Sequence, residues 1–174
     1  EGTALANIGV LHLKQSQPGE AIDYFEAALT IVRKVGSRTE EGMNLGYLGI
    51  ASLGLGDLCT AEDQLKQCIG IMEEGRFVFA STFRGFLARV HAEQGDLDEA
   101  RVVLNAAEAE VRQGSQHMML LAEMLCNRAR VEHIAGDAAA TNGALEEAES
   151  IASALNAGTD SELGKTIAAV RALS

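Results

Sequence analysis

The chain of 174 residues is 47% apolar and 4% aromatic, with a single proline and no tryptophan, and it is rich in Ala and Leu, which favours an all-α fold. Its 25 acidic residues outnumber the 14 basic ones, and this net charge of −11 disfavours nucleic acids and anionic membranes as partners, because phosphate contacts need clustered Lys and Arg. The 3 cysteines lack a Cys-x-x-Cys spacing and no apolar run reaches the roughly 18 residues of a membrane span, so we expect a cytoplasmic protein with reduced thiols.

Periodic apolar residues separated by glycine-containing turns predict nine helices along the chain. The expected helices span residues 2–16, 19–35, 39–55, 58–74, 78–94, 97–113, 117–135, 138–157 and 160–173. Left-handed glycines are expected where the second, fourth, sixth and eighth helices end, at Gly36, Gly75, Gly114 and Gly158. Side chains that cap helix N-termini are expected at Ser37, Ser115 and Asp160.

One pattern of residues recurs along the chain, with equivalent positions 40, 39 and 41 residues apart. It consists of a turn, a small residue, an apolar residue four positions further on and another small residue three beyond that. The residues of this pattern that we expect in the core are Ala21, Phe25, Ala28, Ala61, Leu65, Cys68, Ala100, Leu104, Ala107, Leu145 and Ala148. The last helix should pack on the repeat before it through Leu163, Ile167 and Val170, which follow a helical spacing.

With its turns at Gly56-Asp57, Gly95-Asp96 and Gly136-Asp137, this pattern resembles the tetratricopeptide repeat over nearly the whole chain. Because its period is near 40 residues and not about 34, it is similar to the long-helix variety found in kinesin light chains and in bacterial signal-transduction ATPases and regulators. The resemblance implies an all-α, right-handed superhelical solenoid in a single domain. Its parts would be four helical hairpins at residues 1–36, 37–75, 76–114 and 115–158, and a capping helix at 159–174.

Two further expectations concern the ends and the later repeats. The chain opens at Glu1 without a methionine or a leader segment, so we expect it to be a fragment of a larger protein. Three charged residues, Arg84, Arg128 and Glu132, occupy repeat positions that are usually apolar, and the third and fourth repeats therefore match the family pattern less closely.

The sequence carries no recognisable motif for catalysis. Gly54-Leu55-Gly56 follows a predicted helix and not a strand, so it is interpreted as the repeat's turn and not as a nucleotide loop. The histidines lack the spacing of helical metal ligands, and Arg101 stands where a calcium loop needs glycine. We therefore expect no enzymatic activity, no cofactor and no metal.

Several single residues are instead expected to pack. His12 and His91 share one repeat position and are interpreted as packing residues, and Cys68 as a buried thiol. Cys126 is expected to be partly exposed on the inner surface.

The inner surface of the array would be lined by the first helix of each hairpin, and the resemblance implies that ligands bind there. Carried over by register, the family's contact positions fall on Asn7, Lys14, Tyr47, Ile50, Phe86, Arg89, Asn127, Arg130 and His133. Arg89 and Arg130 occupy the same position of successive repeats, and Arg84 and Arg128 lie on the same two helices. Because arginine pairs bidentately with carboxylates, this basic strip predicts an acidic partner segment. In the alternative interpretation, Arg84 and Arg128 pair with glutamates of adjacent helices.

The favoured function is a non-enzymatic scaffold that binds a protein or peptide segment, and not nucleic acid or membrane, on its concave face. One alternative is a ligand-sensing regulatory domain of a larger bacterial signalling or transcription regulator, in which the concavity would form a closed pocket. Another is a homo-oligomer that forms through the N-terminal edge, where no helix is expected to cap the first repeat.

Overall fold

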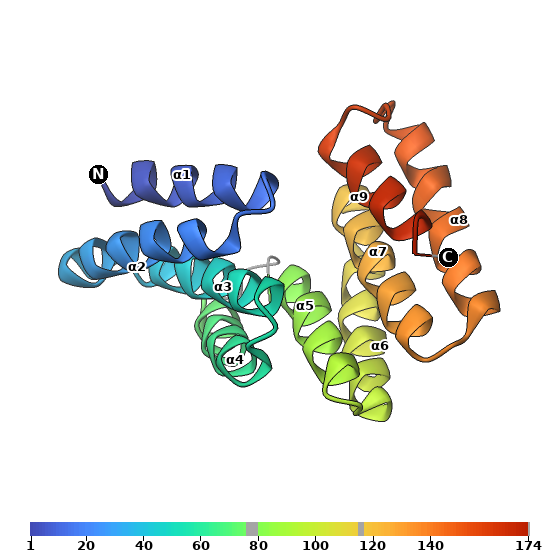
Figure 1. Ribbon diagram of the computed structural model, residues 1–174, viewed down its shortest axis with the longest axis horizontal. Helices are drawn as coiled ribbons and strands as arrows, with labels where there is room; N and C mark the ends of the chain where they lie inside the picture. The colour runs from blue at the N-terminus through green and yellow to red at the C-terminus, as the bar shows by residue number, and fades with distance from the viewer. Residues whose placement is uncertain (76–79, 115–116, 174) are drawn as a thin grey trace. The chain divides into compact units, whose positions relative to one another are not determined.

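The computed structural model describes residues 1–75, 80–114 and 117–173, and in these residues the chain is helical without any strand (Figure 1). The helices are α1 (Gly2–Lys14), α2 (Pro18–Val35), α3 (Arg38–Gly54), α4 (Leu58–Glu74), α5 (Ala80–Glu93), α6 (Leu97–Gln113), α7 (Met118–Ile134), α8 (Ala138–Ala154) and α9 (Glu162–Arg171). The all-α fold class and the helix order are confirmed. Residues 78–79, which were expected to begin the fifth helix, lie outside the described residues.

The helices fall into two compact units, Glu1–Phe83 and Arg84–Ser174, whose boundary lies within α5. In the first unit α1 packs on α2, α2 on α3 and α3 on α4. In the second unit α6 packs on α7, α7 on α8, and α9 on both α7 and α8. Helical hairpins followed by a C-terminal helix are therefore present, and their organisation as a single domain stays a prediction.

The recurring small and apolar residues form the core, as the sequence predicts. All eleven predicted core residues are fully buried, from Ala21 in α2 to Ala148 in α8. Leu163, Ile167 and Val170 of α9 are buried in the cluster that α7 and α8 form, so α9 covers the last hairpin. The small residues are needed because the helices approach closely. A Cβ atom at Gly49, for example, would lie only 2.6 Å from Cγ of Leu65.

The tight turn within a hairpin has the same chemistry in three places. Gly56, Gly95 and Gly136 have φ angles of 78°, 91° and 74°, a left-handed conformation that favours glycine. The aspartate that follows each glycine is the N-cap of the next helix, and its side chain accepts a hydrogen bond from the backbone N–H three residues later. The three bonds run from Thr60 to Asp57 (3.2 Å), from Glu99 to Asp96 (3.1 Å) and from Ala140 to Asp137 (2.9 Å).

The predicted left-handed glycines and caps at the other helix ends are mostly wrong. Of the four glycines only Gly36 is left-handed, with a φ of 77°, whereas Gly75 and Gly114 have φ angles of −81° and −98° and Gly158 has no positive φ. α4 and α6 end on right-handed or extended backbone at their glycines, and after α8 the left-handed residue is Asn156, with a φ of 53°, and not Gly158.

The predicted N-cap residues also differ from the observed ones. Ser37 precedes α3 but makes no side-chain cap bond, and Ser161, not Asp160, caps α9 by accepting the N–H of Gly164 at 3.0 Å. Ser115 lies outside the described residues.

Candidate functional site

Four of the predicted contact residues lie in the first unit. Asn7 and Lys14 are exposed on α1, and Tyr47 and Ile50 are half-buried on α3. The ring of Tyr47 stacks on Phe25 with 5.3 Å between centroids and meets the ring of Phe83 edge-on at 6.1 Å. Tyr47 is therefore part of an aromatic cluster that packs α3.

The other five lie in the second unit, and four of them come together on two helices. Phe86 and Arg89 are one turn apart on α5, and Asn127 and Arg130 are one turn apart on α7. α5 and α7 approach closely here, as Gly85 shows. A Cβ atom at this position would lie only 2.8 Å from Nδ2 of Asn127. We call the surface formed by Phe86, Arg89, Asn127 and Arg130 the α5–α7 face. His133 is exposed beyond it, near the end of α7.

Arg89 is the most enclosed charge of the α5–α7 face. Its side chain is only 19% exposed, and its guanidinium carbon lies 5.5 Å from the centroid of the Phe86 ring. The Nε atom is buried without a hydrogen-bond partner, and the carboxylate of Glu93 is 3.9 Å from a terminal nitrogen. Burial, which has the largest effect, and repulsion from Arg130 together lower the pKa of Arg89 to about 10, so the guanidinium is still charged at neutral pH.

Arg130 is half-buried beside Arg89. Within the described part of the chain it makes no hydrogen bond or ion pair, and burial lowers its pKa. At neutral pH the carboxylate of Glu93 acts on Arg130 in the opposite direction and favours the charged form. The α5–α7 face therefore holds two neighbouring guanidinium groups whose charge is incompletely neutralised.

Arg84 and Arg128 do not belong to this basic face, and their expected place in the basic strip is wrong. Arg84 pairs with Glu110 of α6. Arg128 donates from Nε to Glu108 at 2.7 Å and from a terminal nitrogen to Asn105 at 2.8 Å, both on α6. The alternative interpretation, in which these arginines pair with acids of an adjacent helix, is confirmed.

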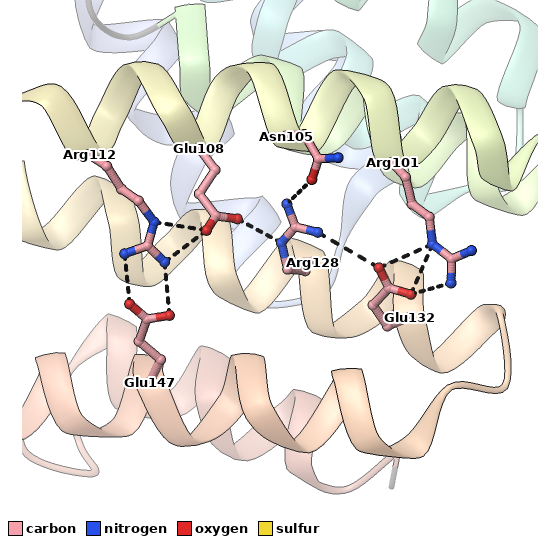
Figure 2. Close-up of polar contacts among 7 residues, drawn as sticks. All are labelled: Arg101, Asn105, Glu108, Arg112, Arg128, Glu132 and Glu147. Atoms are coloured by element: carbon pink, nitrogen blue, oxygen red, sulfur yellow. Dashed lines mark hydrogen bonds and ion pairs between the residues drawn. The ribbon is translucent and has the colours of Figure 1, made fainter.

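Figure 2 shows that Arg128 belongs to a chain of ion pairs across α6, α7 and α8. At one end Glu132, a buried carboxylate of α7, accepts a 2.6 Å bond from Arg101 and lies 3.8 Å from Arg128. At the other end Arg112 pairs with Glu108 at 2.8 Å and with Glu147 of α8 at 2.8 Å. The charged residues at usually apolar repeat positions, Arg128 and Glu132, are thus used to join successive hairpins.

The pairing of the other arginines sets Arg89 and Arg130 apart. Each described arginine of the second unit outside the α5–α7 face has a carboxylate within 3.0 Å, including Arg171 of α9 with Glu149 of α8 at 2.9 Å. Arg89 has its nearest carboxylate at 3.9 Å and Arg130 has no ion pair with a described residue. An anion supplied from outside would fill this deficit.

Glu123, an acidic residue next to this face, was not predicted from the sequence, and Cys126 was predicted to be more exposed than it is. Glu123 lies on α7 seven residues before Arg130, a helical spacing that could have identified it, and burial raises its pKa. Cys126 is buried and not partly exposed, because it belongs to the core cluster that α7 forms with α8 and α9, and burial raises its pKa to about 11. It is therefore a protonated thiol at neutral pH.

Two interpretations of single residues as packing residues are confirmed. Burial of Cys68 is complete and raises its pKa to about 12. His91 is buried, and the ring of His12 stacks on Tyr24 at a centroid distance of 5.1 Å.

The described residues contain no group of three or more His, Cys, Asp or Glu residues placed to hold a metal ion. None of their helices combines the length and the apolar character needed to cross a membrane.

Comparison with known proteins confirms the resemblance to the tetratricopeptide repeat. Residues 1–74 match the family model described as tetratricopeptide repeat. No curated protein matches the sequence. Among solved structures, BtubC from P. vanneervenii is similar with a TM-score of 0.69 and 17% identity, over 90% of this chain and 65% of that one. The chain thus spans just under two thirds of BtubC.

A second protein has the same fold. A putative kinesin light chain from Podosopora anserina with nearly identical TPR-like repeats is similar with a TM-score of 0.61 and 18% identity, over 90% of this chain and 77% of that one. A variant of the same repeats gives a TM-score of 0.61 and 16% identity, over 98% of this chain and 85% of that one. At this level of identity the likeness concerns the fold.

Proposed function

We propose, from the premise that residues 1–74 belong to the tetratricopeptide repeat family, that the chain is a non-enzymatic protein-interaction module that binds an acidic segment of a partner protein. Proteins built from this repeat generally bind other proteins. The observation that carries the acidic character of the partner is the deficit of negative charge around Arg89 and Arg130. A cytoplasmic setting fits the free thiols, among them the exposed Cys59.

The charges of Arg89 and Arg130 are held at an energetic cost. Two guanidinium groups are held close together and partly out of water, and burial lowers the pKa of both. A carboxylate that accepts hydrogen bonds from the two guanidinium groups would offset their mutual repulsion and part of the cost of their burial. The neighbouring ring of Phe86 offers an apolar contact for the rest of the segment.

Binding of synthetic peptides tests this proposal. Three blocked peptides that differ only in carrying Glu, Gln or Lys at one central position would be titrated by fluorescence anisotropy. We expect the Glu peptide to bind about tenfold tighter than the Gln peptide, and the Lys peptide to bind weakest. Arg130→Gln should remove the preference for Glu, whereas Lys165→Gln, the loss of an equal charge at an exposed position of α9, should keep it.

Two results would speak against this function. Equal affinity for the three peptides would contradict the acidic partner. Binding of a small dicarboxylate as tight as that of the Glu peptide would favour the ligand-sensing alternative, because a small molecule would then satisfy the site alone.

A second candidate function is self-association through α1, and the exposure of two apolar side chains supports it. Ile8 is 38% exposed and Leu11 is 55% exposed. The equivalent residues 40 positions later, Leu48 and Ala51, are buried in α3, which has α2 packed against it. The outer side of α1 therefore has the apolar character of a packed repeat surface, and a second copy of the chain could cover it.

Sedimentation at several protein concentrations tests this second candidate. The wild-type chain should show an apparent mass that rises with concentration, and Leu11→Glu should abolish the rise. Val102→Glu, a change at an equally exposed apolar residue of α6, should leave it in place. A constant mass of the wild-type monomer would rule out self-association over the concentrations used.

A further inference from the structure

Glu123 lies on the same side of α7 as Arg130, next to the α5–α7 face, and its charge has no counterpart among the described residues. It is half-buried on α7, and within the described residues it makes no hydrogen bond or ion pair. Its pKa is raised, and burial is the cause. A half-buried carboxylate without a partner is unfavourable in the same way as an unpaired arginine, so it too would gain from an opposite charge brought by a ligand.

The positions of Glu123 and Arg130 on α7 determine the distance between the two residues along the helix. The two residues are seven positions apart on one α-helix, which places them on the same side of α7. Seven residues at a rise of 1.5 Å per residue correspond to about 10 Å along the helix. Cys126 lies between them and is affected electrostatically by both, since Arg130 lowers and Glu123 raises its pKa after the larger effect of burial.

The face therefore presents two positive groups and, about 10 Å away, one negative group. We infer that the partner segment carries a basic residue about 10 Å from its acidic residue, with the acidic side chain on Arg89 and Arg130 and the basic side chain on Glu123. This inference rests on the proposed function, because it adds a second contact to the same site.

The distance of about 10 Å determines how many residues separate the acidic and the basic residue of the partner segment. In an extended segment of the polyproline II type, three residues span about 9 Å and bring the side chain back to the same side. In a helical segment seven residues do so over about 10 Å. A purely acidic segment would satisfy the arginines and bring a like charge toward Glu123. A segment with both charges matches the face along its length, and this match supplies specificity as well as affinity.

A lysine scan tests the inference. The probe is a blocked peptide with one central Glu, in which a single Lys replaces Gln at each position from seven residues before the Glu to seven residues after it. Each peptide is titrated against the wild-type chain, against Glu123→Gln, and against Glu99→Gln as a control at an exposed carboxylate of α6. We expect at least one Lys position, three or seven residues from the Glu, to bind about threefold to tenfold tighter than the peptide without Lys.

The gain should disappear with Glu123→Gln and remain with Glu99→Gln. A scan in which no Lys position improves binding, or in which the improvement survives Glu123→Gln, would overturn the inference while the preference for the central Glu still supports the proposed function. If the wild-type chain binds none of the peptides, the proposed function fails and the inference fails with it.

Discussion

Two helical glycines show how far a single Cβ atom matters in this fold. At Gly46 of α3 the added carbon would overlap the Phe83 ring, with Cδ1 only 2.5 Å away, whereas at Gly70 of α4 it would meet nothing within 4 Å. Gly46→Ala should therefore lower the free energy of unfolding by about 1–3 kcal/mol through overpacking. Gly70→Ala should raise it by about 0.5–1 kcal/mol, because alanine is the better helix former. Chemical denaturation followed by circular dichroism measures both, and a stabilising Gly46→Ala would contradict the observed packing.

Glu123 and Glu147 should contribute to stability with opposite pH dependence. Burial raises the pKa of Glu123, so its stabilising contribution is present while it is protonated and is lost as the pH rises through its pKa in the folded chain. Glu123→Gln should therefore raise the melting temperature at pH 7 and have little effect near pH 3.

The side-chain hydrogen bond from Arg112 lowers the pKa of Glu147, so the stabilising contribution of Glu147 is present at pH 7 and is lost as the pH falls through that lowered value. Glu147→Gln should lower the melting temperature at pH 7, and melting curves from pH 3 to pH 8 would show whether the two variants shift in the same direction instead.

At the scale of the helices, the chain of ion pairs in Figure 2 couples α6 to α7 through a buried carboxylate. Glu132→Gln would leave Arg101 and Arg128 with a weaker acceptor in a site shielded from water. We expect a loss of about 1–3 kcal/mol in the free energy of unfolding. Glu74→Gln is the matched control, because Glu74 meets Arg38 at 3.4 Å with both side chains largely exposed, and it should produce no measurable change. Equal effects of the two variants would mean that the network does not stabilise the fold.

The sequence predicted the helices better than the ends of the helices. The Gly-Asp turns could be recognised because one residue must be left-handed and the next must accept a backbone N–H bond, as at Gly56 and Asp57. Glycine at the opposite helix ends, as at Gly75, carried no such signal, because a helix can end on right-handed backbone with any residue. The glycines of the turns and those of the helix ends therefore looked alike in the sequence, and only the following aspartate distinguishes them.

The candidate site could be predicted only in part for a similar reason. Register placed Arg89 and Arg130 on one face because helix periodicity fixes which side a residue occupies. It could not tell that Arg128 turns to Glu108 of α6, because that depends on which carboxylate lies within reach of a long side chain. It also passed over Glu123, whose significance is the lack of a partner in three dimensions.

At the scale of the whole molecule, the family match and the departures from the repeat pattern divide the chain in the same place. Residues 1–74 match the family model, whereas the charged residues at usually apolar positions, Arg84, Arg128 and Glu132, lie beyond them. In the second unit those residues form ion pairs with α6. The later hairpins thus keep the fold of the repeat while exchanging part of its apolar contact for paired charge.

The net charge of −11 should affect self-association, because two copies of the chain repel each other. Salt weakens this repulsion, and at physiological ionic strength the screening length is about 8 Å. Any dimer formed through Ile8 and Leu11 should therefore strengthen as sodium chloride is raised, because the contact is apolar and the repulsion is screened. Sedimentation in low and high salt measures this, and dissociation at high salt would point to an interface held by charges instead.

The central claim is that Arg89 and Arg130 together hold an acidic segment, and calorimetric titration of one double variant tests it most directly. The Glu peptide would be titrated into Arg89→Gln/Arg130→Gln and into Lys34→Gln/Lys165→Gln, which loses the same charge at exposed positions. Melting curves would establish that both variants are folded. We predict that the arginine variant binds about thirtyfold more weakly or worse, as expected when enclosed charged contacts are lost, and that the lysine variant stays within about twofold of wild type. A folded arginine variant that binds the Glu peptide as tightly as the wild-type chain would contradict the account.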